Sequence, residues 1–279
     1  MTARPLPGTD CAAGIRARVA DRAGRIGTDG RRPVLAVVTA TDDAAAAWYV
    51  RSIASAAETA GVDCRVVDLG AQASPGEIGA CLQDLSADRD VRGIVLQTPL
   101  PAGAEPAVLA GAIVPDKDVD GANPLSLGYL AAGRRAFAPA TAEAVVTLLD
   151  QHDVDVAGCH VVVVGRSTVV GKPLAQLLLD RDATVSLCHS GTRDLAAIAS
   201  SADIVVAAVG HAHLITAEHV GPGATVVDVG TNPTDDGGLA GDVDPAVVGK
   251  AAALTPVPGG VGPVTTALLL QHTVFGPGG

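Results

Sequence analysis

Several stretches of the sequence combine residue types that could bind a ligand, and the first carries an aromatic pair. It reads "AAAAWYVRSIASAAETAG" (44–61) and contains Trp48, the only Trp of the chain, and Tyr49. On a helix, Ile53 lies one turn after Tyr49 on the same face, whereas Arg51 points about 200° away from that face. The stretch is therefore either an ordinary helix that holds two aromatic residues or one wall of a ligand site.

A second stretch places glycines where a phosphate group could bind. In "HVVVVGRSTVVGKPLAQLLL" (160–179), a buried strand leads through a glycine turn into a helix. Gly165 permits the tight turn and Gly171 a close approach of the helix, where free backbone N–H groups and the helix dipole favour a phosphate. The spacing differs from G-x-G-x-x-G, so a plain strand-to-helix turn is the alternative.

The strand that follows indicates which dinucleotide this turn would hold. An NAD site usually has Asp or Glu about 20 residues after the first glycine, where it binds the ribose 2′-OH. Here the strand ends in His189 and Ser190, with Arg193 nearby and no acid, and Arg166 lies in the glycine turn. Two arginines and a hydroxyl can surround a 2′-phosphate, which a carboxylate would repel. These residues favour NADP over NAD, with plain surface solvation of the arginines as the alternative.

Three loop-forming stretches could line a binding cleft. "LQTPLP" (96–101) puts Gln97 at the carboxyl end of a strand, where its amide could bind a ligand or simply cap the turn. "PDKDVDGANP" (115–124) has three acids and one Lys between Pro and Gly residues, a pattern that more commonly means a solvated turn. "TPVPGGVGPVTTALLL" (255–270) has three prolines and three glycines before an apolar helix. So rigid a loop is typical of a binding wall.

The pattern of the chain also predicts the elements that must hold these stretches. Apolar runs predict strands that alternate with helices. The first series has strands at 33–40, 64–69 and 91–101 and helices at 43–60 and 74–87, the second helix with Ser74 as its cap and Pro75 in its first turn. The second series has helices at 141–152, 171–180 and after Thr192, and strands at 160–165, 183–189, 202–210 and 223–230. This order predicts an α/β fold with parallel sheets, in two lobes divided at about residues 140–145.

Composition and charge restrict the class of protein. The 279 residues are 48% hydrophobic but only 2% aromatic, so Ala, Val, Leu and Ile must form the core. No apolar run reaches the roughly 20 residues of a membrane span, and no signal segment is recognisable, which predicts a soluble cytoplasmic protein. The net charge of −11 argues against nucleic acid as a partner. The five cysteines and seven histidines lack the spacings of disulfide frameworks and metal sites, so no metal is expected.

The motifs resemble, in order along nearly the whole chain, those of the methylenetetrahydrofolate dehydrogenase/cyclohydrolase family. The segments that carry the resemblance are "YVRS", "GIVLQTPLP", "PDKDVDGANP", "GCHVVVVGRSTVVGKPLAQLLL", "ATVSLCHSGTRDL", "ADIVVAAVGHAHLIT", "PGATVVDVGTN", "GDVD" and "TPVPGGVGPVTTALLL". The resemblance implies a three-layer α/β lobe that binds folate, a Rossmann-like lobe that binds NADP, and usually a homodimer. It assigns residues 1–142 and 264–279 to the folate lobe and residues 143–263 to the NADP lobe.

The same resemblance implies roles for individual residues. Tyr49, Gln97 and Asp120 are catalytic positions that also bind the tetrahydrofolate substrate: Tyr49 stacks near the pterin and Asp120 grips the pterin ring. Further substrate-binding positions are Pro99, Leu100, Pro258 and Gly262, the last two in a rigid loop that also includes Gly259, Gly260 and Pro263. The cofactor-binding positions are Gly165, Arg166, Ser167, Gly171, His189, Ser190, Arg193, Gly210 and Thr231.

One catalytic position departs from the family pattern. The family's Y-x-x-x-K motif would place a lysine where this chain has Ile53, and the only lysines of the chain are Lys117, Lys172 and Lys250, all in other elements. The family assigns proton relay in the cyclohydrolase step to that lysine, with the Gln nearby. Isoleucine can neither donate nor accept a proton, and such catalysis is worth roughly 10²–10⁴-fold. The cyclohydrolase activity is therefore predicted to be lost or weak.

The predicted function is the dehydrogenase half of the family's chemistry. Oxidation of 5,10-methylenetetrahydrofolate to 5,10-methenyltetrahydrofolate by NADP⁺ is a hydride transfer, which depends on alignment more than on proton relay. Further departures on the folate side are Ala46, "PATAEA" (139–144) and the Thr of "DVGTN". They leave two alternatives open: a paralogue repurposed for another folate-dependent one-carbon reaction, and a non-catalytic folate- and NADP-binding protein. The intact Asp120 and Gln97 argue against the second.

Overall fold

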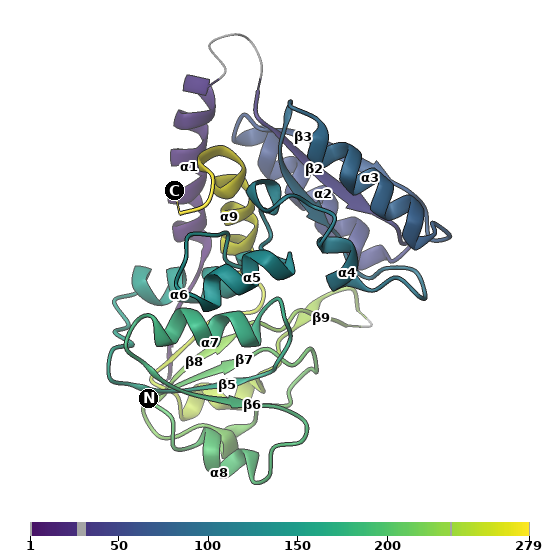
Figure 1. Ribbon diagram of the computed structural model, residues 1–279. Helices are drawn as coiled ribbons and strands as arrows, with labels where there is room; N and C mark the ends of the chain where they lie inside the picture. Colours follow the sequence, from purple (N-terminus) through teal and green to yellow (C-terminus); the bar gives the residue numbers. More distant parts are fainter. Residues whose placement is uncertain (1, 27–31, 235, 279) are drawn as a thin grey trace. The chain divides into compact units, whose positions relative to one another are not determined.

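The chain folds into two compact units, each built on a parallel sheet (Figure 1). The structure, a computed structural model, describes residues 2–26, 32–234 and 236–278. Residues 13–140 and 266–279 form one unit with a sheet of three strands, here called the small-sheet unit. Residues 1–12 and 141–265 form the other, whose sheet has six strands and which is called the large-sheet unit. The predicted α/β class is confirmed.

The small-sheet unit contains the first predicted series of elements. Its strands are β2 (Val34–Thr39), β3 (Asp63–Asp68) and β4 (Val91–Leu96), in the order β3-β2-β4, and its helices are α2 (Ala44–Thr59), α3 (Pro75–Ala87), α4 (Pro106–Ala110) and α5 (Pro124–Ala131). On one face of the sheet, Ala36 and Val38 of β2 belong to a core with Ile78 and Leu82 of α3. Helix α2 lies on the opposite face (Figure 1). Helices thus cover both faces, which explains why β2 is apolar from Val34 to Val38.

Local signals fix where two of these helices begin. The Asp43 carboxylate accepts the backbone N–H of Ala46 at 2.7 Å, which caps α2. Ser74 and Glu77 form a capping box at α3: the Ser74 hydroxyl accepts the N–H of Glu77 at 3.2 Å, and the Glu77 carboxylate accepts the N–H of Ser74 at 2.8 Å. The predicted Ser74 cap is confirmed. Caps of this kind stabilise a helix by about 1 kcal/mol. The Asp43 cap fixes the beginning of α2, the helix that carries Tyr49.

The large-sheet unit contains the second predicted series. Its strands run in the order β1 (Arg4–Pro5), β11 (Ala253–Leu254), β8 (Thr225–Asp228), β7 (Ile204–Ala207), β5 (His160–Val164) and β6 (Thr184–Cys188), and its helices include α6 (Ala140–Gln151), α7 (Gly171–Leu179) and α8 (Leu195–Ala199). A small antiparallel pair, β9 (Asn232–Pro233) and β10 (Leu239–Ala240), follows β8. The chain moves from β5 outward to β6 and then returns to β7 on the other side of β5. The boundary between β5 and β7 is therefore a topological switch point, where open α/β sheets bind ligands.

The beginning of the chain departs from the expected arrangement. Residues 1–12 are assigned by the sequence to the folate lobe, whereas the structure places them in the large-sheet unit. The reason is that β1 pairs with β11, and the N–H of Leu6 donates to the carbonyl of Leu254 at 3.0 Å. Three helices, α1 (Thr9–Ile26), α6 and α9 (Val261–Phe275), contain a boundary between the units within their own length. A strand of two residues has no periodicity from which it could be predicted.

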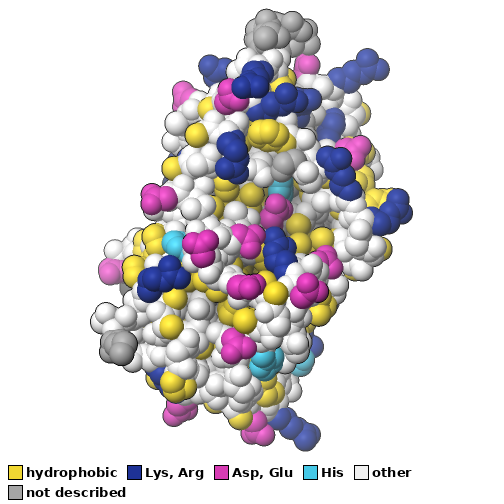
Figure 2. Space-filling model, turned by 90° about the vertical axis from the view of Figure 1, so that its left-hand side faces the viewer, with side chains coloured by type: hydrophobic (Ala, Val, Ile, Leu, Met, Phe, Trp, Pro, Cys, Tyr) yellow, Lys and Arg dark blue, Asp and Glu magenta, His cyan; other side chains and the backbone are white. Residues whose placement is uncertain are grey.

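The surface carries charges of both signs. Figure 2 shows a face on which Lys and Arg side chains are interspersed with Asp and Glu side chains. Trp48 on α2 is 58% exposed, so one member of the aromatic pair is not part of the core. Among the described residues, none of the helices combines the length and the apolar character that crossing a bilayer requires.

Candidate functional site

The predicted nucleotide residues lie at one edge of the large sheet. Parallel pairing puts the last residues of β5, β6, β7 and β8 side by side, because Val164 is opposite both Cys188 and Ala207, and Ala207 is opposite Asp228. The predicted cofactor-binding residues all follow these strand ends, in the loops after β5 (Gly165, Arg166, Ser167, Gly171), β6 (His189, Ser190, Arg193), β7 (Gly210) and β8 (Thr231). The structure therefore brings residues spread over 67 positions of sequence to one edge, counted from 165 to 231.

The glycine turn after β5 has the shape of a cradle for a phosphate. Gly165 has a φ of 130°, and a Cβ there would overlap the carbonyl oxygen of Ala208. A Cβ on Gly171 would overlap the carbonyl oxygen of Gly165. Among the described residues, the N–H groups of Ser167 and Thr168 donate to no protein acceptor. Free N–H groups just ahead of a helix fit an anionic phosphate.

Ser167 shapes this turn as well as facing it. Its hydroxyl accepts the backbone N–H of Val170 at 3.1 Å and that of Gly171 at 3.4 Å, at the beginning of α7. The residue is exposed, so the hydroxyl hydrogen remains directed to solvent or to a ligand. The predicted binding role and a local structural role are therefore compatible.

The loop after β6 offers cationic and polar groups but no carboxylate before Asp194. The backbone N–H of His189 donates to the hydroxyl of Thr192 at 2.8 Å, and His189 Nδ1 accepts the N–H of Gly191 at 3.0 Å. A neutral His189 therefore carries its proton on Nε2. Arg193 and Ser190 are exposed beside this turn. Such a loop can accept a phosphate more readily than a bare ribose hydroxyl.

In the small-sheet unit, a second set of predicted residues lies at the carboxyl end of β4. Asp118 pairs with Ile94 of β4 as a parallel bridge, so Asp120 follows beside the end of that strand. Gln97 begins the loop directly after β4, with Pro99 and Leu100 behind it. The Gln97 side-chain amide donates to the carbonyl of Thr98 at 2.6 Å, which is the turn-capping alternative that the sequence left open. In the described residues its amide oxygen accepts nothing, and it remains available to a ligand.

Tyr49 and Asp120 interact electrostatically, and both side chains are half-buried. Burial raises the pKa of Tyr49 well above its usual range; the charge of Asp120 adds to this, and a hydrogen bond with Thr266 opposes it. The phenol therefore stays protonated. Burial and the neighbouring Asp118 raise the pKa of Asp120 to about 7, with His272 acting in the opposite sense. Asp120 is thus a carboxyl group that titrates near neutral pH beside a phenol.

Asp118 has a structural role in the loop that carries Asp120. It is fully buried, and its carboxylate accepts the backbone N–H groups of Ala122 at 3.0 Å and Asn123 at 2.9 Å. Burial raises its pKa to about 6, although these hydrogen bonds favour the charged form. Asn123 in turn donates to the carbonyl of Ile113 at 2.7 Å and caps α5. The loop is an internally bonded structure rather than a solvated turn.

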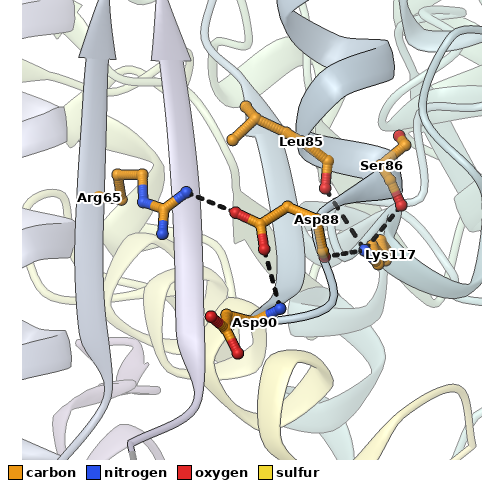
Figure 3. Close-up of polar contacts among 6 residues, drawn as sticks. All are labelled: Arg65, Leu85, Ser86, Asp88, Asp90 and Lys117. Carbon is orange, nitrogen blue, oxygen red and sulfur yellow. Dashed lines mark hydrogen bonds and ion pairs between the residues drawn. The ribbon is translucent and has the colours of Figure 1, made fainter.

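Lys117 in the same loop is occupied by the end of helix α3 (Figure 3). Its ammonium donates to the backbone carbonyls of Ser86 at 2.7 Å and Asp88 at 2.6 Å, and more weakly to that of Leu85 at 3.4 Å. The Asp88 carboxylate pairs with Arg65 at 2.8 Å. A cation at the end of a helix satisfies carbonyls that lack an intrahelical partner. This lysine is therefore committed to the fold.

Ile53 is a core residue of the small-sheet unit. It is 0% exposed and forms the buried stripe of α2 with Ala46, Val50 and Ala57. The spacing of these residues is that of one helix face. The position where the family motif has a lysine therefore holds a buried apolar side chain, one turn after Tyr49.

The family follows from two matches that cover most of the chain. Residues 6–120 match the catalytic domain of tetrahydrofolate dehydrogenase/cyclohydrolase, and residues 139–276 match the NAD(P)-binding domain of the same enzyme. The protein is 63% identical over 272 residues to bifunctional protein FolD 1 of Saccharopolyspora erythraea, which covers 97% of this chain and 93% of that protein. The chain belongs to the tetrahydrofolate dehydrogenase/cyclohydrolase family. The predicted membership is confirmed.

Solved structures of the family have the same fold. The bifunctional FolD enzyme of Campylobacter jejuni is 37% identical, with a TM-score of 0.93 over 98% of this chain and 97% of that one. The Trypanosoma brucei FolD, solved with NADP cofactor and inhibitor, is 35% identical, with a TM-score of 0.92 over 98% of this chain and 96% of that one. Residues 141–265 of the large-sheet unit lie within the match to the family's NAD(P)-binding domain.

Within this family fold, the structure separates the predicted residues into two sets. Tyr49, Gln97, Pro99, Leu100 and Asp120 lie in the small-sheet unit, whereas Pro258 and Gly262 lie in the large-sheet unit with the cofactor-binding residues. The loop of Pro258 follows β11, whose partner β8 leads to Thr231. Their ligand contacts remain predictions.

Two buried aspartates of the large-sheet unit were not predicted as site residues. Asp228 ends β8 and Asp242 belongs to the "GDVD" segment; they are 4% and 0% exposed. Their sequence signal is an acid at the end of an apolar strand and a second acid between a glycine and a valine. Only their hydrogen bonds reveal what they do.

The raised pKa of Asp120 predicts a pH-dependent effect of Asp120→Asn on stability. The folded pKa is about 7 and the ordinary value is 3.8. Between these values the folded protein binds more protons than the unfolded chain, so the Asp120 contribution to stability falls as pH rises through this window. Asp120→Asn should therefore raise the melting temperature at pH 8 by about 2–4 °C, and by much less at pH 4.5.

The exposed Asp116→Asn in the same loop is the matched control and should show no such difference. Thermal unfolding followed by circular dichroism at both pH values measures the effect. An equal shift of the Asp120→Asn melting temperature at pH 4.5 and pH 8 would contradict the assigned pKa.

Proposed function

We propose that the protein is an NADP-dependent methylenetetrahydrofolate dehydrogenase that oxidises 5,10-methylenetetrahydrofolate to 5,10-methenyltetrahydrofolate. The observation that carries this proposal is the alignment of the predicted cofactor residues at one edge of the large sheet, in a chain that belongs to this family. The large-sheet unit is assigned to NADP and the small-sheet unit to the folate. The 35% identical Trypanosoma enzyme solved with NADP supports the choice of cofactor.

The residues fit the cofactor at the positions that distinguish NADP from NAD. The glycine cradle with free N–H groups suits the pyrophosphate, while Arg166, Ser190 and Arg193 suit the 2′-phosphate. NADP⁺ supplies the hydride acceptor when it is bound. The protein's part in that step is to hold the folate still, a role that we assign to Tyr49, Gln97 and Asp120.

We further propose that the cyclohydrolase activity is lost or weak. Ile53 offers no proton to relay, and Lys117 is held by three backbone carbonyls of α3. Relatives such as the Saccharopolyspora protein are named bifunctional, so this part of the proposal depends on the residue at position 53 alone.

We also propose that the enzyme is cytoplasmic and forms a homodimer. Light scattering of the purified protein measures the oligomeric state.

The test separates the two activities. Purified protein is mixed with 5,10-methylenetetrahydrofolate and NADP⁺, and the absorbances of NADPH and of the methenyl product are followed; hydrolysis of added 5,10-methenyltetrahydrofolate is measured separately. The expected result is NADPH formation with accumulation of the methenyl product. Rapid hydrolysis would contradict the loss of cyclohydrolase. Tight folate binding without NADPH formation would favour a repurposed or non-catalytic protein.

The 2′-phosphate assignment predicts a change in cofactor preference. Arg193→Ala should lower kcat/KM for NADP⁺ by roughly 10-fold and leave that for NAD⁺ nearly unchanged, because the lost charge pairs only with the additional phosphate. Initial rates with both cofactors measure this ratio. Arg89→Ala removes an exposed arginine of the small-sheet unit and serves as the control. Equal losses with NADP⁺ and NAD⁺ would be evidence against the assignment.

A further inference from the structure

Asp242 connects two loops of the large-sheet unit through three hydrogen bonds. Its Oδ2 accepts the backbone N–H groups of Val209 at 2.6 Å and Gly210 at 3.0 Å, in the loop after β7. Its Oδ1 accepts the side-chain amide of Asn232 at 2.9 Å, at the beginning of β9, where the loop after β8 ends. The Asn232 amide also donates to the carbonyl of Ala240 at 3.2 Å, so its orientation is fixed by two acceptors. A carboxylate is suited to this place because all three of its neighbours are donors.

A second buried carboxylate holds the segment that carries Asp242. Asp228 accepts the backbone N–H groups of Asp242 at 2.9 Å and Val243 at 2.9 Å, and it accepts that of Gly230 at 2.9 Å in its own loop. The hydroxyl of Thr255 accepts the N–H of Asp228 at 2.7 Å. The position of Asp242 is thus set by the last residue of β8. The two aspartates therefore belong to one buried hydrogen-bond network.

The loops that Asp242 joins lie on one side of the switch point. Ala208 directly precedes Val209, and its carbonyl is the atom that a Cβ on Gly165 would overlap. The loop after β7 therefore packs against the glycine turn after β5. In a doubly wound sheet, one mononucleotide half lies over the first two strands and the other lies across the switch point. Here the first half corresponds to β5 and β6, and the second half to β7 and β8.

We propose that Asp242 is a positioning residue for the nicotinamide half of NADP, which clamps the loops after β7 and β8 so that Gly210 and Thr231 face the dinucleotide. This inference depends on the proposed NADP function, and it adds a residue that touches no ligand. The adenosine half, which would lie over β6 beside Ser190 and Arg193, does not depend on the clamp.

The two halves of the cofactor provide a test that a general loss of stability would fail. Binding of NADP⁺ and of adenosine 2′,5′-bisphosphate, which lacks the nicotinamide half, is measured by isothermal titration calorimetry on the full chain. In Asp242→Asn, an NH₂ group replaces one acceptor and must face a donor. We expect NADP⁺ to bind about 10-fold more weakly, while the affinity for the bisphosphate changes less than about 2-fold.

A reciprocal exchange tests the contact itself. Asn232→Asp places a carboxylate against that of Asp242 and should weaken NADP⁺ binding more than Asp242→Asn does. In the double variant Asn232→Asp/Asp242→Asn, the amide donates to the carboxylate in the reverse sense. We expect the double variant to bind NADP⁺ more tightly than either single variant. Asn232→Ala removes one donor without adding a charge and provides a milder variant, expected at about 3-fold. Asp180→Asn, an exposed carboxylate after α7, is the control.

The outcomes distinguish this inference from the function on which it depends. If the unaltered protein binds neither NADP⁺ nor the bisphosphate, the proposed cofactor is wrong. If it binds both, parallel loss of both ligands in Asp242→Asn would show that Asp242 only stabilises the fold. Unchanged NADP⁺ binding in Asp242→Asn and Asn232→Ala, or a folded double variant no better than the single variants, would also overturn the inference.

Discussion

Replacing Ile53 with Lys should raise the rate of 5,10-methenyltetrahydrofolate hydrolysis by roughly 10²–10⁴-fold, the usual contribution of a positioned acid–base group. The helix places position 53 one turn after Tyr49, so an amine there would lie on the same face as the phenol. Because Ile53 is fully buried, the environment would lower the pKa of the new amine and favour its neutral, proton-accepting form. Hydrolysis is measured from the decay of methenyl absorbance.

The same burial predicts a loss of stability. Placing an amine in an apolar stripe removes packing and desolvates a polar group, so the melting temperature of Ile53→Lys should fall. Ile53→Met introduces an unbranched side chain, as Lys does, but one without a proton to transfer, and is the matched control; its hydrolysis should match that of the unaltered protein. If a well-folded Ile53→Lys variant shows no increase in hydrolysis, Ile53 is not the cause of the weak cyclohydrolase activity. The other folate-side departures, such as Ala46, would then be responsible.

Replacing Gly171 with Ala should weaken NADP⁺ binding by about 100-fold or more, which corresponds to about 2.7 kcal/mol. The added Cβ would overlap the carbonyl oxygen of Gly165. Gly165 cannot move away from the added Cβ, because it already lies against the carbonyl of Ala208. The turn would have to open, and the N–H groups of Ser167 and Thr168 would leave the positions where they converge on a phosphate. Calorimetric titration with NADP⁺ measures the loss.

A second glycine provides the control for this substitution. Gly14 lies exposed within helix α1, and a Cβ there meets nothing within 4 Å. Gly14→Ala should leave NADP⁺ binding unchanged and stabilise the helix by about 1 kcal/mol. Far-UV circular dichroism establishes that both variants fold. A folded Gly171→Ala variant with undiminished NADP⁺ affinity would show that the turn does not hold the cofactor.

The sequence predicts the elements that have strong periodicity or local caps. Strands such as β2 and β5 are apolar except for one terminal residue, because helices cover both faces of a parallel sheet. Ser74 and Glu77 mark a helix start by themselves. Helix α1 was not predicted, because several arginines and small residues separate its few large apolar side chains. The two-residue strand β1 was not predicted either, because only its partner makes it a strand.

The candidate site divides in the same way. Residues that follow a strand end were predictable, because parallel strands align their carboxyl ends at one edge. The functions of Lys117, Asp228 and Asp242 were not, because each depends on at least one partner that lies 14 or more residues away, such as Ser86 for Lys117 and Val209 for Asp242. The raised pKa of Asp120 likewise depends on burial, which no short motif encodes.

The pairing of β1 with β11 has a consequence for biosynthesis. Arg4 leaves the ribosome well before Ala253, its partner in the sheet, which lies 249 residues later in the sequence. The edge of the large sheet therefore closes only after the whole small-sheet segment 13–140 and most of the second series have been translated. Contacts this distant in sequence form late and slow the folding of a chain. Strand β1 therefore lacks its partner until β11 has been synthesised.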